Sequence, residues 1–165
     1  MRTANQREYA WKEEHVTDLY QDLAKAIADV EPDYFLGSVV VAKTDGKLEV
    51  FDGQQRLATT VILLAAIRDW YTETKDTDRA SIIEKDYLLS KSLETLEPEP
   101  NLHLSKVDHD YYMKRVLSTD PAVRAGAIRS VESHERIHDA VTIAAKHVKA
   151  IVAALPENAR GAGIK

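Results

Sequence analysis

The stretch from Val50 to Thr60 constrains this chain most, because a β-rich segment runs into it and an apolar segment leaves it. Residues 35–51 are rich in β-branched and alternating apolar side chains, which favour strands. Residues 57–71 are apolar almost all round, which is typical of a helix in the middle of a domain. Asp-Gly-Gln-Gln-Arg stands between them at 52–56. The sequence therefore predicts a strand–turn–helix junction that carries polar side chains.

The residue types at this junction suit a phosphate group. Gly53 permits close backbone approach, and the N–H groups that follow it lie at a helix N-terminus, where an anion is favoured. Arg56 adds a planar fork of donors that matches phosphate oxygens. The junction is thus interpreted as a phosphate-binding corner, and the alternative is a turn followed by a surface arginine.

The remaining polar residues of the corner have two candidate roles each. Gln54 and Gln55 are expected to contact the backbone of the turn and the substrate, because amides do not titrate, and one of them could orient a water molecule. Asp52 could help to hold Mg²⁺, or it could simply form the turn, and both interpretations stay open.

Length and composition limit the remaining possibilities. A chain of 165 residues predicts one globular domain, either undivided or built as two small lobes. Because the net charge is −5, any contact with nucleic acid needs a local positive patch or another chain. The lack of cysteine excludes disulfides, thiol catalysis and cysteine-bound zinc. The longest apolar run, 61–67, is too short to span a membrane, and the N-terminus is polar. We expect a cytoplasmic protein without a membrane partner.

The hydrophobic pattern predicts a mixed α/β domain that is mostly helical and has a small sheet. A β-hairpin (35–42 and 47–51, with an Asp45-Gly46 turn) is expected to pack under the helix of 57–71, and the last helix against that helix. Asp108 and Ser133 are expected to be N-caps. Helices are expected at 13–30, 57–71, 80–89, 108–117 and 133–155, a break at 97–101, a short strand at 102–104, and a loop or short helix at 119–130.

Histidine spacing gives no metal site. His134 and His138 are four residues apart on an expected helix, but no third ligand is suitably placed. These two, with His103, His109 and His147, are expected to be solvent-exposed.

At this point the motifs resemble a known family. Gln-Arg-Glu-Tyr-Ala-Trp at 6–11 resembles the Y-Q-R-x-Y-x-W opening of the N-terminal domain of GmrSD-type restriction endonucleases, with Asn5 replacing the first tyrosine. Similar landmarks follow at 34–38, 52–57, 102–104 with Asp108, and Ser133 with Arg136-Ile137. Asn5 and the short segment before it suggest that part of an N-terminal strand is absent.

The resemblance implies a ParB/sulfiredoxin-like domain of a bacterial anti-phage or modification-dependent restriction system, in which the 52–56 corner binds and hydrolyses a nucleoside triphosphate with Mg²⁺. It implies a motif-bearing α/β core at 1–76, a helical part at 77–156 and a tail or linker at 157–165. Asp52, Gln54, Gln55 and Arg56 would be catalytic, with Asp52 at the metal. The nucleotide would contact Gly53, Gln54, Gln55 and Arg56 together with Arg7 and Tyr9, although Tyr9 and Trp11 are more often core residues than stacking platforms.

Three functions follow as hypotheses. The first is that the chain is a nucleoside triphosphatase that gates DNA cleavage by a nuclease domain or subunit. That nuclease is expected to lie elsewhere, because the six histidines show no H-N-H arrangement. Alternatively, the chain senses nucleotide or modified DNA without turnover. A weaker third hypothesis is a docking domain whose last helix pairs with a partner, including another copy of the chain.

Overall fold

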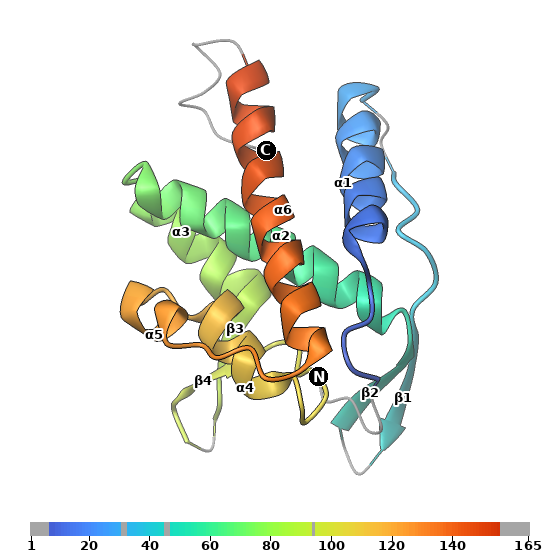
Figure 1. Cartoon of the computed structure of the whole chain (residues 1–165), viewed down its shortest axis with the longest axis vertical. Coiled ribbons are helices and arrows are strands. Elements are labelled where there is room, and N and C mark those ends of the chain that lie inside the picture. Colours follow the sequence, from blue (N-terminus) through green and yellow to red (C-terminus); the bar gives the residue numbers. More distant parts are fainter. Residues whose placement is uncertain (1–6, 31–32, 45–46, 94, 156–165) are drawn as a thin grey trace.

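The computed structural model describes residues 7–30, 33–44, 47–93 and 95–155 (Figure 1). Helices and two small antiparallel sheets make up a mixed α/β fold. The elements are α1 (Glu13–Ala28), β1 (Val40–Thr44), β2 (Lys47–Asp52), α2 (Gln54–Glu73), α3 (Thr77–Ile83), η1 (Glu84–Leu88), β3 (Leu89–Lys91), β4 (Pro98–Pro100), α4 (His109–Tyr112), η2 (Met113–Leu117), α5 (Pro121–Ala125) and α6 (Glu132–Ala154), where η marks a π-helical turn.

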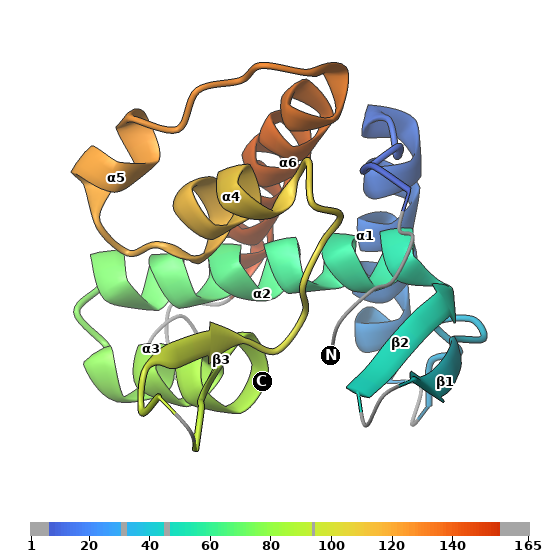
Figure 2. The ribbon, with the colours of Figure 1, turned by 90° about the horizontal axis from the view of Figure 1, so that it is seen from below.

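Helix α2 lies in the middle of the fold, as the apolar run predicts. Helices α3 and α6 pack on α2, and α1 packs on α6. Figure 2 shows α6 mainly above α2, α3 below it, and α1 crossing behind the N-terminal half of α2. Ala58, Ile62 and Ala65 are buried along α2, and Ile137, Ala140 and Ala144 face them from α6 within the same core. None of the helices in the described ranges combines the length and apolar composition that a bilayer span requires.

The β-hairpin is shorter than predicted and differently placed. Strands β1 and β2 pair antiparallel with an irregularity after Val40, while residues 35–39 form no strand. The hairpin does not pack under α2 but lies at its N-terminal end (Figure 2). Only Val50 among its described apolar side chains is buried, whereas Phe51 is 61% exposed. Residues 35–39 instead pass beside the first turn of α2, where Arg56 donates a hydrogen bond to the Leu36 carbonyl oxygen. The Asp45-Gly46 turn lies outside the described residues.

The segment predicted as one helix over 80–89 is divided into three elements. Helix α3 starts at Thr77 with Asp76 as its N-cap, η1 follows, and β3 begins at Leu89. Residues 97–101, predicted as a break, contribute β4, and no strand forms at 102–104. A two-stranded sheet consists of edge strands, and edge strands tolerate proline, which explains how Pro98 and Pro100 can belong to one.

The other helices follow the predicted pattern with shifted ends. Helix α1 ends at Ala28 rather than residue 30, and Val30 has a left-handed φ of 55°. Residues 109–117 are helical, and the uncertain 119–130 segment contains the short helix α5. Helix α6 begins at Glu132 with Val131 as its N-cap, so the assignment of Ser133 as the cap is wrong. The Ser133 side chain is buried and serves another purpose, described below.

A buried arginine that the hydrophobic pattern does not reveal joins α2 to both π-helical turns. The Arg68 side chain is 1% exposed and forms ion pairs with Glu84 (2.7 Å) and Asp69 (2.9 Å). Its Nη1 and Nη2 donate to the carbonyl oxygens of Leu117 (2.9 Å) and Val116 (3.2 Å) at the end of η2. A buried cation is stable only when its donors are satisfied, and these acceptors come from three elements. Arg68 therefore fixes how η1 and η2 pack on α2.

Substitution of Arg68 by methionine should destabilise the fold. Arg68→Met keeps an unbranched side chain but leaves Glu84, Asp69 and two carbonyl groups without their donor, which should lower the free energy of unfolding by about 3–5 kcal/mol. Urea denaturation measures this. The matched control is Arg79→Met, since Arg79 is half exposed and pairs with Asp76 at the surface. Equal effects of the two substitutions would contradict the assignment.

Candidate functional site

A pocket of about 420 Å³ opens at the N-terminus of α2. It brings together residues that are far apart in the sequence, from the N-terminal segment, the end of β2 and the first turn of α2. Its lining consists of Arg7, Trp11, Phe51, Asp52, Gly53, Gln54, Gln55 and Arg56. The predicted corner residues and Arg7 thus line one pocket. Trp11 is partly buried and packs against the core, as expected, and it stacks on His15 with ring centroids 5.9 Å apart.

Gly53 places the start of α2 at the pocket. Its φ of 84° lies in the left-handed region, where an L side chain is strained, and a Cβ here would lie 3.0 Å from Cγ2 of Val39 and 3.1 Å from the Ser38 oxygen. Helix α2 begins at Gln54, three residues earlier than predicted, and Gly53 supplies no side-chain cap. The first N–H groups of a helix have no carbonyl acceptor within it. These donors therefore lie at the wall of the pocket.

Arg56 is held in place by the segment that precedes β1. Its Nη1 donates to the carbonyl oxygen of Leu36 (2.8 Å), and its guanidinium covers Gly37, whose φ is 99°. A Cβ on Gly37 would lie 1.4 Å from Nη1 of Arg56. Arg56 is half-buried rather than an exposed helix-start residue. One hydrogen bond uses one of its five N–H donors, so others can serve an anion.

Both glutamine side chains hold backbone. Nε2 of Gln54 donates to the Val50 carbonyl oxygen (2.5 Å), which ties the first turn of α2 to β2. Gln55 accepts a hydrogen bond from the Ala10 N–H (2.7 Å) and donates to the Glu8 carbonyl oxygen (3.3 Å). Gln55 therefore pairs with the N-terminal segment as a neighbouring strand would. Of these two amides, Gln54 is the one whose side-chain oxygen has no hydrogen bond within the described residues.

Tyr9 lies beneath the pocket in the core. It is 2% exposed, and its hydroxyl shares a hydrogen bond with Oγ1 of Thr59 (2.7 Å). Burial raises the pKa of the Tyr9 phenol to about 12, so it stays protonated at neutral pH. The core reading of Tyr9 is correct, and its ring offers no exposed face on which a base could stack. Tyr9 anchors the segment that carries Arg7.

Asp108 anchors the same segment from the other side. It is the N-cap residue of α4, as the sequence predicts, but its carboxylate has another role. Its side chain is 1% exposed and makes no capping hydrogen bond to α4. Instead its carboxylate accepts hydrogen bonds from the Tyr9 N–H (2.8 Å), the Ser105 hydroxyl (3.0 Å) and the Ser133 hydroxyl (2.5 Å). A buried carboxylate needs such donors. Asp108 thereby joins the N-terminal segment to the start of α6.

The histidines are not the exposed side chains that were predicted. His134 is buried and stacks on Tyr111, with ring centroids 4.4 Å apart and an interplanar angle of 8°. Its Nε2 lies 3.1 Å from the Val107 carbonyl oxygen. His103, His109, His138 and His147 are partly buried. Within the described ranges, no three His, Asp or Glu side chains are placed to hold a metal ion.

Sequence reasoning missed the residues that position the site. Gly37 and Asp108 belong to the family landmarks, but their contacts with Arg56 and Tyr9 were not predicted, and Thr59, which bonds the Tyr9 hydroxyl, was not singled out at all. The available signal was the glycine at position 37, two residues before the β-branched run, because glycine permits both a positive φ and close approach.

Comparison with known proteins adds a family match to this geometry. The model described as GmrSD restriction endonuclease, N-terminal domain, matches residues 4–160. The matched region contains the pocket and the helices that support it. The match confirms the resemblance found in the motifs. No curated protein is similar enough in sequence to count as a match.

Substitution of Gly37 should disturb the corner without touching α2 itself. Gly37→Ala forces its Cβ onto the Arg56 guanidinium and strains the backbone, and a residue held in such a region costs about 1–3 kcal/mol. Thermal melting should show this loss of stability as a lower melting temperature. The control is Gly126→Ala, because a Cβ there would lie 3.4 Å from its nearest neighbour and no positive φ is involved. A Gly37→Ala protein that melts like the control would contradict the described position of Arg56.

Substitution of Asp108 should loosen the N-terminal segment. Asp108→Ala leaves the Tyr9 N–H and two serine hydroxyls buried without their acceptor, which should cost about 3 kcal/mol or more in urea unfolding. Asp110→Ala removes a nearby carboxylate that forms an exposed pair with Lys114, and it should have little effect. Similar unfolding curves for both variants would show that the Asp108 network does not stabilise the fold.

Proposed function

The chain belongs to the GmrSD restriction endonuclease N-terminal domain family, and from this premise we propose that its pocket at the start of α2 binds and hydrolyses a nucleoside triphosphate. The family makes the chain a component of a restriction system. In this proposal, nucleotide turnover gates DNA cleavage by a nuclease domain or subunit outside the chain. A ParB/sulfiredoxin-like core, a cytoplasmic location and self-association belong to the same proposal.

One observation carries the proposal: two arginines and the uncapped start of a 20-residue helix line a single pocket. Arg7 comes from the N-terminal segment and Arg56 from α2. A helix N-terminus favours an anion through its free N–H groups and its dipole, and two guanidinium groups add fixed positive charge. A chain of phosphates is the anionic ligand that this combination suits best.

The roles of the groups follow from how they are held. The N–H groups after Gly53 would donate to phosphate oxygens, and Arg56 would neutralise charge that grows in the transition state. The Leu36 carbonyl and Gly37 already fix the guanidinium of Arg56, so little ordering remains for binding. Arg7 has no hydrogen-bond or ion-pair partner within the described residues, and it is free to close over the phosphates.

The pocket also fits a magnesium ion that is shared with the nucleotide. Asp52 is the one carboxylate in the pocket lining, and Mg²⁺ commonly binds proteins through one or two carboxylates together with substrate phosphates. Asp52 would therefore hold the ion only when phosphates supply further oxygens. Such an ion would neutralise charge on the phosphate oxygens during transfer.

Hydrolysis needs a water molecule in line with the terminal phosphate. Gln54 has a side-chain oxygen available for that water, whereas both polar atoms of Gln55 are occupied by backbone. We therefore assign water orientation to Gln54 and a positioning role to Gln55. Asp52, the carboxylate of the pocket lining, is the group that could accept the proton of this water molecule.

The second candidate function is nucleotide sensing without turnover. A specific observation favours it: the lining offers a single carboxylate, which would have to serve both the metal and the proton transfer. A sensor needs only the phosphate contacts. The two functions predict equal binding but differ in phosphate release.

Arg7 provides the cleaner test of phosphate binding, because it supports nothing else in the described structure. A charge-assisted hydrogen bond contributes on the order of 1.5–3 kcal/mol, so Arg7→Ala should weaken nucleotide binding roughly tenfold to a hundredfold while the melting temperature stays unchanged. Calorimetry with several Mg²⁺–nucleotides measures the affinity, and phosphate release with and without DNA measures turnover.

Arg56→Ala should lose as much binding and should also melt earlier, since it removes the contact with Leu36. Arg79→Ala, on the exposed side of α3, is the arginine control and should bind like the wild type. Unchanged binding in both pocket variants would refute the phosphate site. Binding by the wild type without any phosphate release would favour the sensor.

A further inference from the structure

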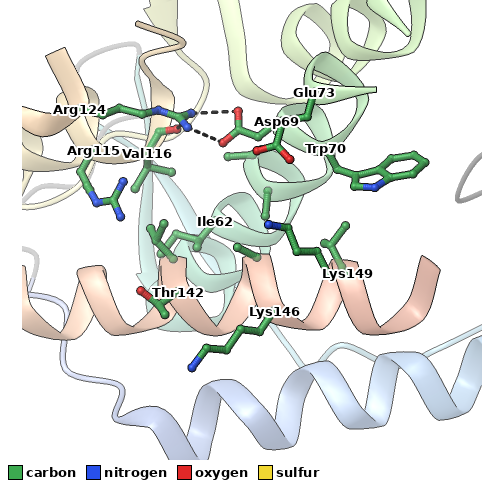
Figure 3. A pocket seen from close by; sticks show the side chains of 15 residues that line it. Ile62, Asp69, Trp70, Glu73, Arg115, Val116, Arg124, Thr142, Lys146 and Lys149 are labelled. Carbon is green, nitrogen blue, oxygen red and sulfur yellow. Dashed lines mark hydrogen bonds and ion pairs between the residues drawn. The ribbon is translucent and has the colours of Figure 1, made fainter. Parts of the chain in front are cut away.

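A second pocket lies between α2 and α6, near the opposite end of α2 from the first. Its volume is about 330 Å³, and apolar side chains such as Ile62, Ala66 and Val148 form its floor. Figure 3 shows charged groups around this floor, with Arg115 on one side, Lys149 reaching in from α6 and the Arg124–Asp69 ion pair between them. Asp69 is 15 residues beyond Gln54, so the two pockets lie roughly 20 Å apart along α2.

Positive charge dominates the second pocket. Its acidic side chains are Asp69 and Glu73, and Asp69 is already paired with Arg68 (2.9 Å) and Arg124 (2.7 Å). Within the described residues, no carboxylate lies at ion-pair distance from Arg115, Lys146 or Lys149. A chain with a net charge of −5 therefore carries unpaired cations on this face.

An adjoining pocket of about 430 Å³ extends the positive surface. It shares Arg115 and Arg124 with the second pocket and adds His138 and Arg129, which pairs with Glu135 (2.8 Å). Burial and the nearby Arg115 lower the pKa of His138, so this ring is neutral at neutral pH and its Nδ1 can accept the Nε–H of Arg115 (3.4 Å). We call the five cations of the two pockets, Arg115, Arg124, Arg129, Lys146 and Lys149, the basic trough.

We infer that the basic trough binds the phosphodiester backbone of double-stranded nucleic acid. Its cations come from η2, α5, α6 and the segment between the last two, and they are distributed over two adjoining pockets rather than gathered around one point. That distribution suits a row of phosphates better than a single small anion. The resulting contacts would be independent of sequence, because they reach the backbone and not the base edges.

The aromatic residues favour a duplex over a single strand. Proteins that bind single strands usually stack bases on exposed aromatic rings. Tyr111 is 3% exposed and is already covered by His134. Trp70 packs edge-on against Tyr71, and Figure 3 shows its ring directed away from the cavity. The trough therefore offers cations without a stacking surface.

Duplex binding can be tested by fluorescence anisotropy on the 165-residue chain, with labelled DNA of about 20 base pairs between about 50 and 200 mM salt. The test variant is Arg115→Gln/Lys149→Gln, which spares Arg124 because Arg124 pairs with Asp69. Each lost phosphate contact should reduce the slope of log K against log salt by about 1, so the double variant should lose about 2 and bind roughly tenfold more weakly.

The control variant Lys25→Gln/Lys43→Gln removes the same charge from α1 and β1, and it should bind like the wild type. Equal weakening by both double variants would overturn the proposal, as would absence of duplex binding at the lowest salt. Tighter binding to a single strand of the same sequence would overturn the choice of duplex. The Arg115→Gln/Lys149→Gln variant should bind Mg²⁺–nucleotide like the wild type, because neither residue lines the first pocket, so the basic trough and the nucleotide pocket can succeed or fail separately.

Discussion

The buried carboxylate of Asp108 is the interaction on which the first pocket depends. It accepts hydrogen bonds from the backbone of Tyr9 and from two serine hydroxyls, one of which belongs to α6. An unpaired carboxylate would be costly at 1% exposure, so the three donors must be present together. The N-terminal segment is thereby fixed against α6 and α2. Because of this contact, Arg7 and Arg56 line the same pocket, although 49 residues separate them in the sequence.

Helix α2 connects two surfaces of different character. Its first turn lines the first pocket, and its last turns line the second pocket. Arg68 holds the second half of the helix by ion pairs and by donating to the end of η2, which also carries Arg115. A helix held at both ends can present each surface in a fixed geometry. Any coupling between nucleotide and DNA would pass through this rigid element.

Several polar residues act on distant backbone rather than where their local sequence suggests. Gln55 pairs with residues 8 and 10, Ser133 donates to Asp108 instead of capping α6, and His134 stacks on Tyr111. Capping rules describe isolated helix ends, where water competes for the same groups. In the core, a buried carboxylate or an unpaired backbone group attracts the donor more strongly, and the local preference gives way.

The sequence by itself determined the strand–turn–helix corner, the central apolar helix and the corner residues that line the first pocket, because each rests on local periodicity or on backbone chemistry such as that of Gly53. It also determined the family through motifs that are contiguous in the chain. Only the tertiary structure decided that the hairpin lies at the N-terminal end of α2 and that the Arg56 guanidinium packs on Gly37. It also decided the partners of Asp108 and Arg68 and brought the cations of the basic trough together. These features join residues tens of positions apart. The local sequence pattern does not predict such pairings, because they form when buried polar groups find hydrogen-bond partners across the packed core.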